Sequence, residues 1–118
     1  MNLVIYVGED RESYGQITAL INRSESESIV LVKNKKVIDF PFDERCKIIE
    51  VDTSADINSL REDIKEKVKK EIGKEFEISL SIASGTGKEH MALISALLAI
   101  PVGVKFVVFT RNGIEFIN

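Results

Sequence analysis

Continuous apolar runs alternate along the chain with stretches in which apolar positions recur every three or four residues. Residues 3–7 are a continuous apolar run, as expected of a strand buried on both faces of a parallel sheet. Residues 14–22 and 57–72 instead have helical spacing, with one apolar stripe each. Further strands are predicted at 29–32, 47–51, 76–82, 104–109 and 114–117, and a third, almost wholly apolar helix at 91–100.

This alternation predicts an α/β protein with a Rossmann-like three-layer sandwich, in which helices cover both faces of a mostly parallel sheet. The whole chain, residues 1–118, is expected to form a single domain. Asn112-Gly113 between two apolar runs indicates a C-terminal antiparallel hairpin. Residues 37–42 are predicted to be a short strand or an extended edge segment, because Pro41 cannot lie in a central strand.

Local signals also predict how the connections begin and end. Residues 53–56 resemble a capping box in front of the helix at 57–72, and Gly73 is expected to end that helix. Residues 33–45 show no helical pattern. The second and third strands are therefore expected to be joined without a helix.

Composition narrows the classes of function. The net charge of −3 disfavours broad nucleic-acid binding, which needs a basic face. Cys46 and His90 are the only cysteine and histidine, so neither an internal disulfide nor a Cys/His metal cluster is expected. No apolar run has the length of a membrane span, and a strand pattern follows Met1-Asn2 directly, without a signal peptide. A cytoplasmic protein without metal or cofactor is the resulting expectation.

The strongest chemical signal is the sequence Ser-Gly-Thr-Gly-Lys at residues 84–88, between a predicted strand and a predicted helix. A glycine-rich turn there leaves backbone N–H groups free, and the helix start and Lys88 add positive charge, so the loop suits a phosphate or another anion. In a doubly wound sheet, ligands bind at the carboxyl ends of strands near the reversal of strand order. The loops at 8–13 and 84–88 are therefore expected to line one crevice, flanked by Thr110.

The loop is not a Walker A motif. That motif needs a glycine at position 82, where this chain has Ile82, and a hydroxyl residue after the lysine, where it has Glu89. A nucleotide triphosphatase is therefore disfavoured. A dinucleotide-binding protein is disfavoured as well, because the loop after the first strand lacks G-x-G-x-x-G. From the residues alone, an anion site and a simple tight turn with an exposed lysine remain equally open.

The placement of this loop, the apolar helix after it and the closing hairpin together resemble the CRISPR-associated Rossmann-fold (CARF) domain. That family carries a Thr-Gly-Gly-Thr-Lys-type loop after its fourth strand, to which Ser84, Gly85 and Lys88 correspond. Thr86 and Gly87 stand in swapped order, and Met91 falls one place late in the following helix. The family's usual helix between the second and third strands is missing, so the fold would be a shortened version.

The resemblance implies a homodimer that binds a cyclic oligoadenylate second messenger across its two-fold axis. With no fused effector domain in the chain, it implies either a stand-alone sensor or sink, acting on an effector protein in trans, or a metal-independent ring nuclease. Lys88 and Ser13 are then the candidate catalytic residues, for charge stabilisation and as a hydroxyl. The candidate ligand-binding residues are Gly8, Arg11, Ser84, Gly85, Thr86, Gly87, Lys88 and Thr110.

Each assignment has a plainer alternative. Ser13 suits a helix N-cap, and Thr110 suits an ordinary hairpin turn. Arg11 suits a solvated side chain, and His90 suits either a general acid or base or a surface residue. The first loop contains three acidic residues, Glu9, Asp10 and Glu12. Their negative charge would repel a phosphate unless the side chains point away or hold a cation. The alternative function is a small Rossmann-like interaction or structural domain with no ligand chemistry.

Overall fold

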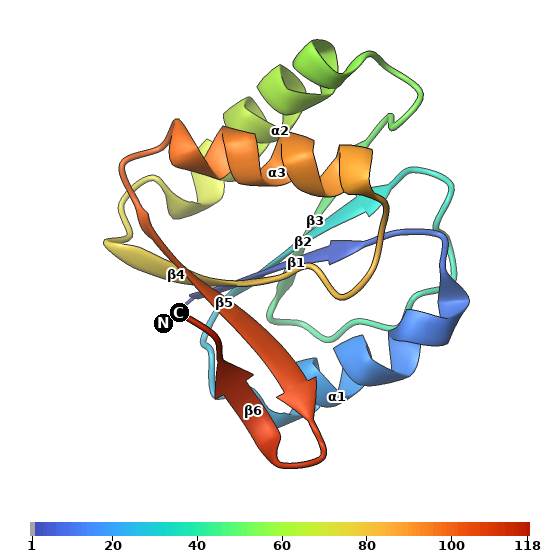
Figure 1. Ribbon diagram of the computed structural model, residues 1–118, viewed down its shortest axis with the longest axis vertical. Helices are drawn as coiled ribbons and strands as arrows, with labels where there is room; N and C mark the ends of the chain where they lie inside the picture. The colour runs from blue at the N-terminus through green and yellow to red at the C-terminus, as the bar shows by residue number, and fades with distance from the viewer. Residues whose placement is uncertain (1) are drawn as a thin grey trace.

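The computed structural model describes residues 2–118, which form a six-stranded sheet with three helices (Figure 1). The strand order is β3-β2-β1-β4-β5-β6; the first five strands are parallel and β6 is antiparallel to β5. This is the predicted α/β, Rossmann-like architecture with a C-terminal hairpin. The elements are β1 (Asn2–Val7), the short 3₁₀ helix η1 (Arg11–Ser13), α1 (Tyr14–Arg23), β2 (Ile29–Asn34), β3 (Cys46–Val51), α2 (Ile57–Ile72), β4 (Glu77–Ser81), α3 (Gly87–Leu98), β5 (Gly103–Thr110) and β6 (Gly113–Phe116).

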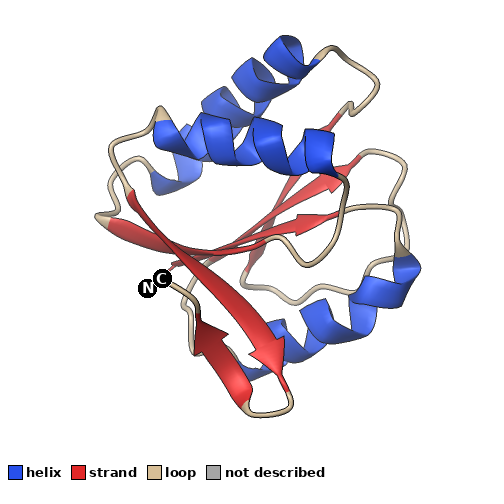
Figure 2. Ribbon diagram, viewed as in Figure 1, coloured by secondary structure: helices blue, strands red, loops and turns tan. Residues whose placement is uncertain are grey.

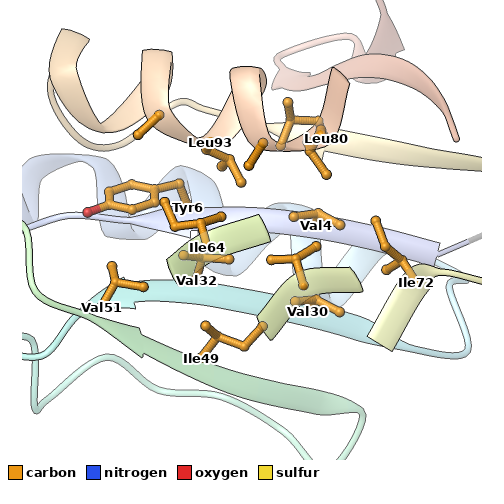
Figure 3. Close-up of a cluster of buried hydrophobic side chains, with 14 of the residues drawn as sticks. Val4, Tyr6, Val30, Val32, Ile49, Val51, Ile64, Ile72, Leu80 and Leu93 are labelled. Atoms are coloured by element: carbon orange, nitrogen blue, oxygen red, sulfur yellow. The ribbon is translucent and has the colours of Figure 1, made fainter. Parts of the chain in front are cut away.

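One face of the sheet is covered by α2 and α3, which lie side by side (Figure 1). Alternate residues of the strands point to this face and meet the apolar stripe of α2, as Figure 3 shows for Val4, Val30 and Ile64. These side chains are almost completely buried, and Ala92 and Ala96 allow α3 to approach closely. The sheet and two helices therefore form the larger core of the molecule.

The opposite face is covered less regularly. Helix α1 packs against β1 and β5, and the β2–β3 connection, residues 35–45, runs on the same side as a loop (Figure 2). Its Val37 and Phe40 are buried in the core beneath α1. The connection contains no helix, as expected, but residues 37–42 form neither predicted alternative, a short strand or an extended segment at the sheet edge. Pro41 removes one ladder donor, and the segment lies across the sheet face instead of extending its edge.

The helix ends differ from the prediction in detail. Helix α2 is capped by Asp56, whose side chain accepts a hydrogen bond from the Ser59 amide at 2.8 Å, so a capping box at 53–56 is wrong. Gly73 does follow α2, but with right-handed backbone angles. The capping box lies at α3, between Thr86 and Glu89. No helix among residues 2–118 has the length and apolar character needed to cross a bilayer.

Candidate functional site

The two loops predicted to line a crevice follow β1 and β4, at the point where the strand order reverses. These two strands are hydrogen-bonded neighbours, so the loops that follow them meet. The Gly8 amide donates to the Ser84 hydroxyl at 2.8 Å. A Cβ atom at Gly8 would lie 2.8 Å from the Gly85 Cα atom, so only glycine permits this approach. The fold thus brings together two loops that are more than seventy residues apart.

The glycine turn at Ser84-Gly85 holds an anion, and that anion is the side chain of Asp10. One carboxylate oxygen, Oδ1, accepts hydrogen bonds from the Ser84 hydroxyl at 2.6 Å and from the Gly85 amide at 2.9 Å. The other oxygen, Oδ2, accepts from the Ser13 hydroxyl at 2.6 Å. We call the three donors of Ser13, Ser84 and Gly85 the donor cradle.

The electrostatics of the donor cradle favour a negative charge. Partial burial raises the pKa of the Asp10 carboxyl, but the hydrogen bonds from Ser13, Ser84 and the Gly85 amide outweigh it and hold that pKa below its ordinary value. Gly85 has a φ of +104°, a conformation that other residues rarely adopt. A Cβ atom there would lie 2.7 Å from the Tyr6 ring, so both space and backbone angle require glycine.

Lys88 does not direct its charge into the donor cradle. Its ammonium donates to the carbonyl oxygens of Thr53 at 2.9 Å and Ala55 at 2.6 Å, in the loop between β3 and α2. Thr86 and Gly87 lie at the start of α3. The Thr86 amide donates to the Glu89 carboxylate at 2.8 Å, and the Thr86 hydroxyl accepts from the Glu89 amide at 3.4 Å. The second half of the loop therefore caps α3.

The other predicted site residues separate into two groups. Ser13 joins the donor cradle, and its side chain makes no helix-capping hydrogen bond. Arg11 instead pairs with Asp39 of the β2–β3 connection. Thr110 lies at the end of β5, where its hydroxyl donates to the Glu115 carboxylate at 2.6 Å within the hairpin. Arg11 and Thr110 thus have their polar contacts outside the donor cradle.

Beneath the turn lie two aromatic groups. His90 Nε2 is 2.6 Å from the Ser84 carbonyl; because a carbonyl oxygen only accepts, Nε2 carries the proton and donates it. The Tyr6 ring is buried edge-on to His90, and its hydroxyl has no hydrogen-bond partner within residues 2–118. Burial, and then the Glu89 carboxylate beside it, raise the pKa of the Tyr6 hydroxyl. Through its hydrogen bond to the Ser84 carbonyl, His90 supports the backbone of the turn.

The arrangement is suited to holding an anionic oxygen by hydrogen bonds. No group of three or more His, Cys, Asp or Glu side chains within residues 2–118 is placed to hold a metal ion. Sequence reasoning missed two participants, Asp10 and Glu89. The Thr-x-x-Glu spacing of Thr86 and Glu89 is a recognised signal for a capping box. No sequence signal indicates that Asp10 folds back onto a loop 75 residues away.

Comparison with known proteins supports the fold. The chain matches no protein-family model and no curated protein sequence. Among solved structures it is similar to the C-terminal domain of the hydrogenase PF1911 from Pyrococcus furiosus, with a TM-score of 0.53 and 9% sequence identity. The similarity covers 89% of both chains. At this identity the likeness concerns the α/β architecture alone.

Proposed function

We propose that this protein binds a cyclic oligoadenylate at the crevice between the β1 and β4 loops, with one phosphate in the donor cradle. The observation that carries the proposal is the convergence of Ser13, Ser84 and Gly85 on the carboxylate of Asp10. Donors that hold a carboxylate are also suited to a phosphate oxygen. A ligand phosphate would take the place of the Asp10 carboxylate, which is only partly buried.

A homodimer belongs to the same proposal. Helix α3 exposes Met91 at 64% and Leu98 at 77% of their surface, and Leu98 also borders a groove of about 280 Å³ over β5. Residues 91–104 contain no charged side chain, so two copies of an acidic chain would meet there without like-charge repulsion. Replacing Leu98 with Glu should convert a dimer to a monomer in analytical ultracentrifugation; a monomeric wild type would contradict this part.

Within the proposal, the chain is either a sensor or sink or a metal-independent ring nuclease. For cleavage, Lys88 would have to leave the Thr53 and Ala55 carbonyls and approach the scissile phosphate, while Ser13 already lies at the donor cradle. Incubation of the protein with cyclic tetra-adenylate without metal, followed by chromatography, separates the two. Linear products indicate a ring nuclease; an intact ring bound to the protein indicates a sensor.

A second candidate is a Rossmann-like interaction or structural domain without ligand chemistry. Two observations favour it. Asp10 already satisfies the donor cradle, and Lys88 is engaged with backbone carbonyls. Under this candidate both side chains only join the loops at the carboxyl edge of the sheet.

Calorimetric titration with cyclic tetra-adenylate tests the proposal directly. We expect saturable binding by the wild type and at least a tenfold loss for Ser84→Ala, because Ser84 supplies a buried donor. Lys88→Ala should also weaken binding, because in the proposed complex Lys88 leaves the Thr53 and Ala55 carbonyls for the ligand. Lys70→Ala, which removes an exposed lysine on α2, should not weaken it. Absence of heat and of any thermal shift at high ligand concentration would reject ligand binding and leave the second candidate.

A further inference from the structure

A groove of about 390 Å³ lies on the α1 side of the sheet, over β2 and β3, whereas the donor cradle follows β1 and β4. Its floor is formed by β2 and β3, and its wall by the loop that joins them. The lining is mainly apolar, from Leu31, Val37, Ile38, Phe40, Phe42 and Ile48. Ile38 and Phe42 stand exposed at its border, so the groove continues into apolar surface.

A buried cation lines this groove. Lys33 lies on β2 with 11% of its side chain exposed, in a position where the strand pattern favours an apolar residue. Its ammonium donates to the Val37 carbonyl and contacts the Glu50 carboxylate at 3.1 Å. An ammonium has three N–H donors, so these two contacts leave one donor available.

The carboxylate that pairs with Lys33 is itself weakly held. Glu50 lies on β3 opposite Lys33 in the parallel register, and 58% of its side chain is exposed. No other hydrogen bond or ion pair of the Glu50 carboxylate occurs within residues 2–118. A half-exposed carboxylate loses little when water replaces its partner, so another carboxylate can compete with it for the ammonium.

We propose that this groove binds an amphipathic monocarboxylate, such as a medium-chain fatty acid, with the carboxylate on Lys33 and the tail along the apolar lining. The buried ammonium selects the charge of the head group, and Glu50 already shows that a carboxylate fits against it. The tail would cover Ile38 and Phe42, which otherwise face water. The inference is independent of the proposed function, because none of the residues that line this groove belongs to the donor cradle.

The test uses the full chain and decanoate below its micelle-forming concentration, with decanol as the uncharged analogue. Binding is followed by calorimetry and by amide chemical shifts in NMR. We expect saturable binding of decanoate with shifts at Lys33, Ile48 and Glu50 and none at Gly85. Lys33→Met should weaken binding at least tenfold. Glu50→Gln should strengthen it several-fold, because the competing carboxylate is gone.

Lys47→Met is the matched control, since Lys47 is exposed on β3 but pairs in register with Val30 of the opposite core. It should bind decanoate as the wild type does. The Glu50→Gln result keeps the test decisive if Lys33→Met fails to fold. The proposal is overturned if decanoate does not bind, if decanol binds as tightly, or if Glu50→Gln leaves the affinity unchanged.

Discussion

The donor cradle and the Lys33 groove both contain a carboxylate of the protein itself against the groups that would recognise an anion. They differ in how firmly that carboxylate is held. Asp10 accepts three hydrogen bonds from two loops and is partly buried. Glu50 has one contact, to the Lys33 ammonium, and its side chain is 58% exposed.

This difference means that, of the two proposed anion sites, the one with more hydrogen-bond donors is also the harder one for a ligand to enter. A ligand in the donor cradle must displace the Asp10 carboxylate, which then loses its protein hydrogen bonds and is solvated by water. A ligand at Lys33 displaces a carboxylate that is already half in water. Affinity at each place therefore depends on competition between the ligand and the protein's own side chain.

Distorting the backbone turn of the donor cradle should have the largest effect on stability. Gly85→Ala forces a positive φ on alanine and drives its Cβ into the Tyr6 ring. We expect a loss of about 2–4 kcal/mol in the free energy of unfolding, measured by denaturant titration. Gly87→Ala is the control, because nothing lies within 4 Å of a Cβ there, and it should be neutral or slightly stabilising. Equal effects of the two substitutions would contradict the described turn.

Removing the internal anion should change stability and binding in opposite directions. Asp10→Ala leaves Ser84 and the Gly85 amide unpaired, so unfolding free energy should fall by about 1–3 kcal/mol. Affinity for inorganic phosphate should rise about 5–30-fold, because the competitor is absent. Glu9→Ala removes the same charge from an exposed position and controls for simple repulsion. Lower stability without gained phosphate affinity would favour a purely structural role for the turn.

The pH dependence of stability should show a smaller effect, which tests the Asp10 carboxylate directly. Hydrogen bonds hold the pKa of Asp10 below its ordinary value of 3.8. Its contribution is therefore fully present above that value and is lost as pH falls through the lower native pKa. Between neutral pH and about pH 3, wild type should lose more stability than Asp10→Ala. Parallel pH profiles of the two proteins, measured by denaturant titration, would argue against a stabilised Asp10 carboxylate.

Removing the weakly held carboxylate should have the smallest effect. Glu50→Gln should change the free energy of unfolding by no more than about 1 kcal/mol. The Glu50 side chain is largely exposed, so its ion pair with Lys33 contributes little to stability. Thermal melts of this variant and of Asp10→Ala under the same conditions make the comparison. A loss for Glu50→Gln as large as that for Asp10→Ala would mean that Lys33 depends on Glu50 more than its exposure indicates.

Most of the architecture follows from local pattern. Continuous apolar runs such as residues 3–7 become central parallel strands, and helical spacing in 57–72 becomes α2. The adjacency of β1 and β4 also follows, because right-handed crossovers restrict the possible strand orders. The strand predicted at 37–42 fails because its apolar residues cover the sheet face through tertiary contacts that local spacing does not encode.

The sequence by itself determined the α/β fold and the glycine turn at the carboxyl edge of the sheet, because both arise from neighbouring residues. Only the tertiary structure decided how the charges are used. Asp10 accepts from the Gly85 amide, 75 residues away, and Lys88 donates to carbonyls 33 and 35 residues away. Such contacts depend on which loops the folded sheet brings together, and a polar side chain takes whichever partner is then within reach.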